Sequence, residues 1–338
     1  MKKALLSLVT AASLSACGVG AKHPVDFKEG VPTNAMVKLS SPDTASSGSK
    51  LTGTERTPTL PGKTASVQGQ VADLYVVTRV TTVLVNGTTA IILGVLRGTV
   101  EDRAATVTGE VAVYGPYTPT LSLITWRLTV TRTEGHIFSY ALEGKIRGTD
   151  DASFTSVLTG SHTVALDADG NALHGYGHGT FQIDWQHSGK LSGLGQSTGS
   201  AQFAYAHDSA TAPLTVAVTY DKVFDAAQTN AENAEYRYAE QPDGSGAFEF
   251  AADLNAQPWD VTKSALERWT IKSRWQPTGV GRSDVKLAGG DLTTPATLNE
   301  CWDTSFDSTY VSRSYDIGYD YGTEATGCAL TPADYSKL

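Results

Sequence analysis

Two histidines four residues apart are the clearest candidates for metal chemistry. His174 and His178 lie in a segment that also contains three glycines, and imidazole nitrogens bind zinc at about 2.1 Å. On a straight strand, residues four apart share a face but are about 13–14 Å from each other, and glycines disfavour a helix. A metal site at this pair therefore requires a bulge that folds the strand back. The alternative is a pair of partly exposed sheet histidines.

A short acidic loop just before these histidines suggests calcium. Asp167, Asp169 and Asn171 alternate as oxygen ligands do in calcium loops. That pattern requires a glutamate at its twelfth position, where His178 stands instead. Asp-Gly-Asn is typical of a hairpin turn, and we interpret the loop as one.

Signatures of catalysis are missing from the sequence. There is no Gly-x-Ser-x-Gly motif, no phosphate-binding loop and no dinucleotide fingerprint. Ser161 precedes His162 directly, but neighbours on a strand point to opposite faces. We therefore predict no catalytic residue and no cofactor. A hydrolase whose residues converge only in three dimensions remains a third, weaker hypothesis.

The N-terminus has the parts of an export signal. Lys2 and Lys3 precede an apolar run over residues 4–13, which is shorter than the about 20 residues that a membrane span requires. The sequence Leu14-Ser15-Ala16-Cys17 then resembles the lipobox of bacterial lipoproteins. The resemblance implies a signal peptide over residues 1–16, cleavage before Cys17, and attachment of diacylglycerol and palmitate-like acyl chains to that cysteine. The alternative is an ordinary secretory signal.

The residue after the cysteine bears on the destination. Lipoproteins of two-membrane bacteria that stay in the inner membrane usually carry aspartate there, whereas this chain has Gly18. The resemblance therefore implies a lipid-anchored protein of the outer membrane, on its periplasmic face or at the cell surface.

The other two cysteines form an even pair in an exported protein. We predict a disulfide between Cys301 and Cys328, which would stabilise the fold by about 3.5 kcal/mol in the chain-entropy model. Their wide spacing disfavours the alternatives, a redox-active or metal-binding pair. An acidic group that we interpret as a solvated face surrounds the pair: Glu300, Asp303, Asp307, Asp316 and Asp320.

The charge of the chain limits its partners. Removing residues 1–16 removes two lysines, which leaves 24 basic against 35 acidic residues and a net charge of −11. Nucleic acid and anionic lipid would repel such a protein. We expect membrane attachment through the N-terminal lipid alone, with an envelope protein or a hydrophobic ligand as partner.

The chain divides into two regions after the signal. Residues 17–66 form the lipidated N-terminus and are rich in Ser, Thr, Pro and Gly, which predicts a flexible tether. Residues 67–338 show period-2 alternation interrupted by turns. Residues 76–85 and 89–100 are predicted as a hairpin around Asn86-Gly87, the strongest short hairpin signal.

These patterns predict an all-β domain over residues 67–338 with about twelve to fourteen strands and no long helix. A sheet of this size must curl, since open twisted sheets rarely exceed about ten strands. We expect a large antiparallel curled sheet, either barrel-like or folded into a two-sheet sandwich. A membrane-spanning barrel is disfavoured because charges interrupt many strands and the chain lacks a terminal aromatic residue.

Apolar residues that alternate on two strands suggest an interior. Phe138 and Tyr140 on one strand, and Trp269 and Ile271 on another, would line a cavity if the curled sheet held a hydrophobic ligand. The preferred function is a non-catalytic envelope lipoprotein whose tethered β domain acts in binding or surface structure. The carrier of a lipid-like ligand is the alternative.

The C-terminal region shows a second resemblance, carried by four short stretches. They are Arg274-Trp275-Gln276, residues 279–284, Gly289-Gly290-Asp291 and Glu300-Cys301-Trp302-Asp303. This segment is similar to uncharacterised lipoproteins of myxobacteria. The similarity implies no activity.

Overall fold

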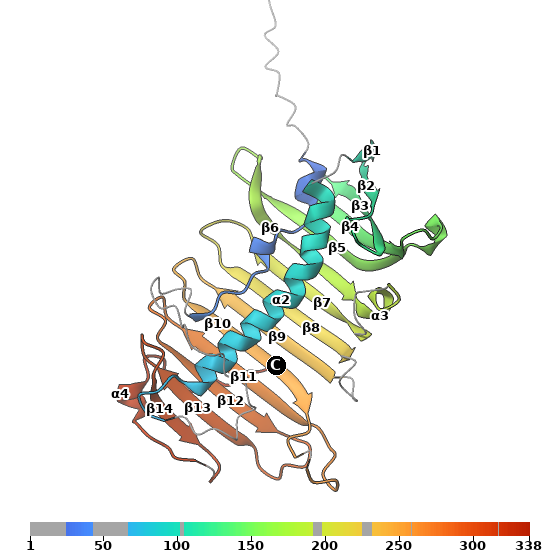
Figure 1. Ribbon diagram of the computed structural model, residues 1–338. Helices are drawn as coiled ribbons and strands as arrows, with labels where there is room; N and C mark the ends of the chain where they lie inside the picture. Colours follow the sequence, from blue (N-terminus) through green and yellow to red (C-terminus); the bar gives the residue numbers. More distant parts are fainter. Residues whose placement is uncertain are drawn as a thin grey trace, which may run out of the picture.

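The computed structural model describes residues 25–42, 67–101, 105–191, 198–224, 232–257, 259–316 and 318–338. Within these ranges the chain forms one antiparallel sheet of fourteen strands, in which each strand pairs with its neighbour in sequence. β1 and β14 are the two edges, so the sheet is open (Figure 1). The predicted all-β curled sheet is confirmed. It is a single curled layer, neither a closed barrel nor a two-sheet sandwich.

The strands are β1 (Thr106–Thr108), β2 (Val111–Tyr117), β3 (Ile124–Glu134), β4 (Ile137–Ile146), β5 (Thr155–Leu166), β6 (Ala172–Asp184), β7 (Thr198–His207), β8 (Leu214–Phe224), β9 (Glu232–Glu240), β10 (Gly246–Leu254), β11 (Glu267–Trp275), β12 (Gly281–Ala288), β13 (Ala296–Trp302) and β14 (Ser308–Arg313). The short helices are η1 (Phe27–Gly30), η2 (Asn34–Met36), η3 (Asp151–Ser153), α3 (Trp185–Ser188) and α4 (Glu324–Gly327).

One long helix, α2 (Asp73–Glu101), crosses the sheet diagonally from the C-terminal strands to β2 and β3 (Figure 1). The hairpin predicted around Asn86-Gly87, and the prediction that the chain has no long helix, are therefore wrong. The buried residues of α2 recur at intervals of three or four, as a helix requires. They are Leu74, Tyr75, Thr78, Thr82, Val85, Thr89, Leu93, Leu96, Thr99 and Val100.

The environment of α2 explains why its β-branched residues do not form strands. A hairpin inside the curl of the sheet would have two edges of N–H and C=O groups without partners, whereas a helix pairs its backbone groups internally. Threonine is tolerated because its hydroxyl bonds to the preceding turn. Thr78 Oγ1 donates to the Leu74 carbonyl at 2.8 Å, and Thr89 Oγ1 donates to the Val85 carbonyl at 2.9 Å.

Residues 25–42 form a strap that lies beside α2 on the same face of the sheet (Figure 1). The strap buries Val31, Met36 and Leu39. Asn86 of α2 holds it like a pairing strand, since Asn86 Oδ1 accepts from the Leu39 N–H and Asn86 Nδ2 donates to the Leu39 carbonyl, both at 2.8 Å. Residues 25–42, which the sequence assigned to the tether, therefore belong to the folded body.

The sheet has an inner face, on which α2 and the strap lie, and a polar outer face. The alternation predicted for β4 is confirmed, because Phe138, Tyr140 and Leu142 are all buried on the inner face. On the outer face, cross-strand ion pairs connect neighbouring strands, such as Arg127 with Glu143 at 2.9 Å. Polar pairs on one side and apolar packing on the other require a fixed register.

Candidate functional site

The four residues predicted to line an interior all lie on the inner face, but at two separate places. Phe138 and Tyr140 are on β4, whereas Trp269 and Ile271 are on β11. Strand pairing separates the two pairs by the width of seven strands. The sheet therefore does not bring the four together into one site.

The strap fills the space in front of the β4 pair. Phe27 of η1 makes an edge-to-face contact with Phe138, with 6.0 Å between ring centroids. A Cβ atom placed on Gly30 would lie only 2.6 Å from the Phe138 ring. Phe138 is fully buried by this packing. In this structure the β4 pair supports the chain's own strap.

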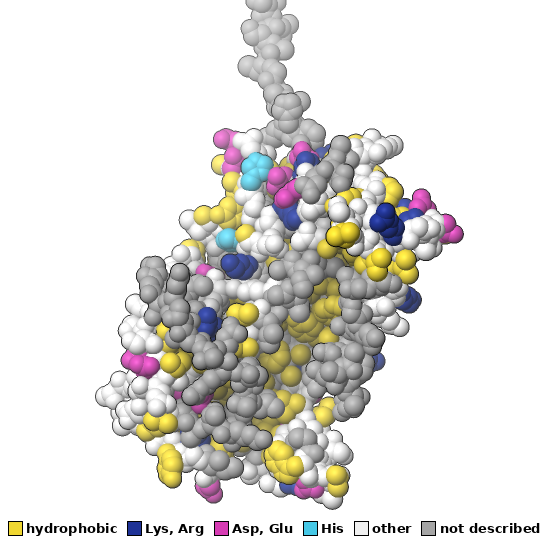
Figure 2. All heavy atoms as spheres, in the orientation of Figure 1, with side chains coloured by type: hydrophobic (Ala, Val, Ile, Leu, Met, Phe, Trp, Pro, Cys, Tyr) yellow, Lys and Arg dark blue, Asp and Glu magenta, His cyan; other side chains and the backbone are white. Residues whose placement is uncertain are grey.

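The other half of the inner face, toward the opposite ends of the strands, retains partly exposed apolar side chains. Trp185 stacks on Tyr220 with 6.0 Å between ring centroids, and Phe250 packs edge-to-face against Trp269 at 5.8 Å. Leu287 lies beside Trp269 on the next strand. In Figure 2 apolar side chains gather in a recess on this face beside α2. We call the four aromatic residues Trp185, Tyr220, Phe250 and Trp269, together with Leu287, the aromatic row.

One polar atom in the aromatic row has no partner among the described residues. The Trp269 indole Nε1 is buried, and no described group accepts a hydrogen bond from it. An unsatisfied buried donor costs about 1–3 kcal/mol. The aromatic row thus combines an apolar surface with one free N–H donor.

A buried histidine lies on the covered half of the inner face. His162 Nδ1 is 2.8 Å from the Tyr205 hydroxyl, and burial lowers the pKa of the His162 imidazole to about 4. Burial also raises the pKa of the Tyr140 and Tyr205 phenols. Ser161 is exposed on the opposite face. The adjacent serine and histidine therefore do not form a catalytic pair.

The two candidate metal ligands bind separate acids. His174 Nδ1 is 2.8 Å from Glu29 Oε1 in the strap, and His178 Nδ1 is 2.8 Å from Asp208 Oδ1 beyond β7. Gly175 and Gly177 have positive φ angles and make an irregularity in the pairing of β6 with β5. Among the described residues, no three metal-binding side chains come together at these histidines or elsewhere.

The acidic loop before them is a hairpin turn between β5 and β6. Asp167 Oδ1 accepts hydrogen bonds from the backbone N–H groups of Asp169 and Asn171 at 2.9 and 2.8 Å. Hydrogen bonds from Asn171 lower the pKa of the Asp167 carboxyl. The carboxylate is thus occupied by the turn itself.

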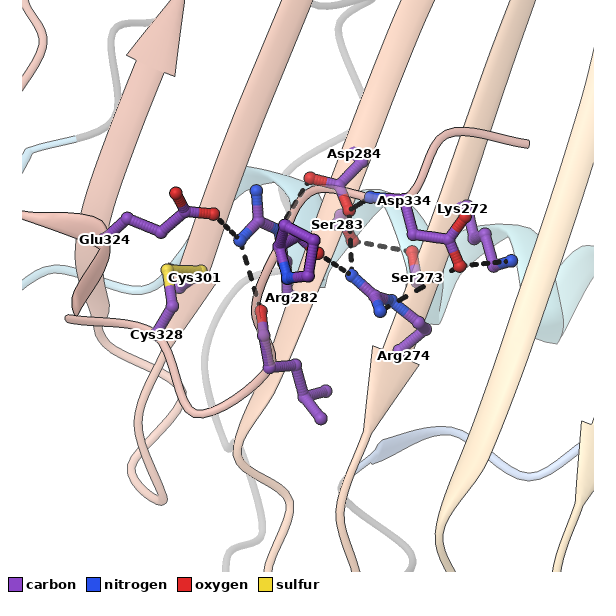
Figure 3. A network of polar contacts seen from close by, with 12 residues as sticks. Lys272, Ser273, Arg274, Arg282, Ser283, Asp284, Cys301, Glu324, Cys328 and Asp334 are labelled. Carbon is purple, nitrogen blue, oxygen red and sulfur yellow. Dashed lines mark hydrogen bonds and ion pairs between the residues drawn. A yellow bond between two sulfur atoms is a disulfide. The ribbon is translucent and has the colours of Figure 1, made fainter. Parts of the chain in front are cut away.

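The predicted cysteine pair joins the C-terminal tail to the sheet. Cys301 on β13 and Cys328 after α4 lie at disulfide distance, with 5.4 Å between their Cα atoms. Beyond Cys328 the tail crosses the outer face of β12 and β11, where polar side chains hold it (Figure 3). Lys272 Nζ forms an ion pair with Asp334 Oδ2 at 2.8 Å, and Arg274 Nη2 donates to the Pro332 carbonyl at 3.0 Å.

Arg282 lies at the centre of this network and is only 1% exposed. Its Nε donates to Asp284 Oδ1 at 2.7 Å, while its Nη1 reaches Glu324 of α4 and the Leu330 carbonyl (Figure 3). A guanidinium presents several donors in a fixed plane, so one side chain ties β12 to α4 and to the tail. Residues 274–303, the segment that carries the second resemblance, therefore have a structural role in this fold.

Glu300 on β13 is a site that the sequence analysis missed. We interpreted it as part of a solvated face, but it is fully buried on the inner face. Its Oε2 accepts from the Leu74 N–H at 2.6 Å and its Oε1 from Ser308 Oγ at 2.6 Å. A carboxylate is favourable at the positive end of a helix. The available signal was its position two residues after Leu298, which places both side chains on the same face of a strand.

No family model, curated protein sequence or solved structure shows a significant match to this chain. None of the helices in the described ranges combines the length and the apolar composition that crossing a membrane requires.

Proposed function

We propose that this chain is an outer-membrane lipoprotein, cut before Cys17 and lipidated there, whose β body acts by binding rather than by catalysis. The observation that carries the proposal is the sequence Leu14-Ser15-Ala16-Cys17 after a basic start and a short apolar run. The Cys301–Cys328 disulfide is consistent with an exported protein, because such bonds persist in oxidising compartments.

The arrangement of polar groups favours binding over catalysis. Two buried polar clusters in the described ranges join segments of the chain to one another: Glu300 to α2, and Arg282 to the tail. Glu300 accepts from the Leu74 N–H and Ser308 Oγ, and Arg282 donates to Asp284, Glu324 and the Leu330 carbonyl. Such groups stabilise a rigid body that presents its surface to a partner.

The test is the chemical state of Cys17 in the full-length chain, expressed in a two-membrane bacterium. We expect membrane fractions to contain a chain that begins at Cys17 and carries the mass of a diacylglycerol and an acyl group. The matched control is Cys17→Ser, which should remain unlipidated and leave the membrane. A membrane-free chain with an unmodified Cys17 thiol would refute the proposal.

The aromatic row supports a second candidate, the binding of a lipid-like ligand beside α2. Its side chains are largely apolar, and the rings of Tyr220 and Phe250 are only partly buried. A peptide in this recess would need partners for its backbone, as the strap finds in Asn86 and Tyr238. A hydrocarbon chain requires none, because it carries no backbone donors or acceptors.

Native mass spectrometry of residues 18–338 tests this candidate. We expect an extra mass of a few hundred daltons that is lost on denaturation. Phe250→Glu, which places a charge in the aromatic row, should abolish it, whereas Val83→Glu at an exposed position of α2 should not. A bare mass in the unsubstituted protein would refute the carrier function and leave the lipoprotein proposal intact.

A further inference from the structure

The folded body begins close to the predicted lipid anchor. Val25 is the first described residue, and its carbonyl accepts a hydrogen bond from Arg132 Nη2 at 2.5 Å. Further along the strap, Arg97 of α2 donates to the Pro32 carbonyl at 3.2 Å, and Asn86 holds Leu39. The start of the strap is thus fixed at the end of the sheet that carries the β3–β4 hairpin.

The connection from the anchor to the strap is short. Only residues 18–24 separate Cys17 from Val25. The eight steps from Cys17 to Val25 span at most about 28 Å when fully extended. As a flexible coil, the same piece has an r.m.s. length of about 16 Å.

Helix α2 shows how far the other end of the body extends. Its C-terminal turns lie at the start of the strap, where Arg97 bonds Pro32, and its first turn lies on β13, where Leu74 bonds Glu300. A helix of 29 residues is about 43 Å long. The distance from one end of the body to the other therefore exceeds the full reach of the linker.

We propose that the end of the body with η1 and the β3–β4 hairpin faces the lipid surface, and that β12–β14 and the disulfide point away from it. This inference rests on the proposed lipidation of Cys17. The mature chain has a net charge of −11, so an anionic membrane repels the body and only the short linker holds it. The surface formed by α4 and the C-terminal tail is then presented to the aqueous space, where a soluble or envelope partner can reach it.

Fluorescence energy transfer from the body to the membrane tests this orientation. The full-length lipidated protein is reconstituted in vesicles of phosphatidylethanolamine and phosphatidylglycerol that contain an acceptor attached to a lipid headgroup. A donor is attached to Glu134→Cys at the β3–β4 hairpin or to Gln68→Cys before α2, both exposed positions. The backbone at Gln68 lies beside β14, because the Gly69 N–H donates to the Ser308 carbonyl.

We expect transfer from position 134 to be several-fold higher than from position 68. In a matched variant with a thirty-residue Gly-Ser insertion after residue 21, the difference should shrink. Equal transfer from both positions of a membrane-bound protein would overturn the orientation and leave the lipidation intact. A protein that does not remain with the vesicles would refute the proposed lipidation, and the orientation with it.

Discussion

The contact between Asn86 and the strap gives the most direct test of the structure. Asn86→Ala removes two hydrogen bonds of 2.8 Å, one to the N–H and one to the carbonyl of Leu39. At about 1 kcal/mol for each neutral hydrogen bond, the strap loses about 2 kcal/mol. A tenfold change in an equilibrium constant corresponds to about 1.4 kcal/mol, so the equilibrium constant for local opening of the strap rises about thirty-fold. Alanine also favours the helix over asparagine by about 0.5 kcal/mol, so global stability falls by less.

Hydrogen exchange read by mass spectrometry measures this effect. In Asn86→Ala we expect faster exchange of the Leu39 amide and its neighbours in the strap, with α2 still protected. Val83→Ala, at an exposed position of the same helix, is the matched control and should leave the strap unchanged. Unchanged strap exchange in Asn86→Ala would refute the reasoning.

Three further perturbations test the packing and electrostatics of the body. Reducing the Cys301–Cys328 disulfide, or replacing both residues by serine, should lower the free energy of unfolding in urea by about 3.5 kcal/mol; an unchanged midpoint would contradict the pairing. The pKa of His162 is lowered to about 4, so its neutral form contributes stability that is complete above pH 6.5. As the pH falls from 6.5 to 4, this histidine gains its proton only in the unfolded chain, and the free energy of unfolding falls by about 3 kcal/mol. His162→Asn should flatten this pH dependence of stability. An equally steep profile in the variant would exclude His162 as the cause. The added Cβ of Gly94→Ala on α2 meets no atom within 4 Å, so this substitution should raise the melting temperature and stabilise the fold by about 1 kcal/mol. Gly160→Ala places its Cβ 2.5 Å from the Thr180 carbonyl oxygen and should lower stability by several kcal/mol. Equal shifts in melting temperature for the two variants would contradict these environments.

Much of the sheet followed from the sequence alone, because each strand carries its own pattern. The alternation through Phe138 and Tyr140 predicts which side chains are buried, and the structure buries them on the inner face. The predicted turn at Asp169-Gly170-Asn171 likewise separates β5 from β6. The cysteine pair was predictable because, with Cys17 assigned to lipid, only two cysteines remain. In each case the deciding residues lie close together in sequence or are few in number.

Only the tertiary structure decided the state of residues 73–101. Locally they are rich in valine and threonine and contain Asn-Gly, which favours strands. In the fold, every strand between β1 and β14 is already paired on both sides, and the space inside the curl requires an element that satisfies its own backbone. Thr78 can be buried there because Ser273 on the facing strand lies within hydrogen-bond distance of its hydroxyl, and no pattern within residues 73–101 shows that partner.

The separation of the predicted interior residues has the same origin. Phe138 and Trp269 show the same alternation in sequence, yet the strap covers Phe138 while Trp269 packs against Phe250 of the neighbouring strand. The strap is held by Asn86, forty-seven residues beyond Leu39 in the chain. Local sequence reveals which face of a strand is apolar. What covers that face depends on contacts between distant segments, which arise only when the whole sheet has curled around α2.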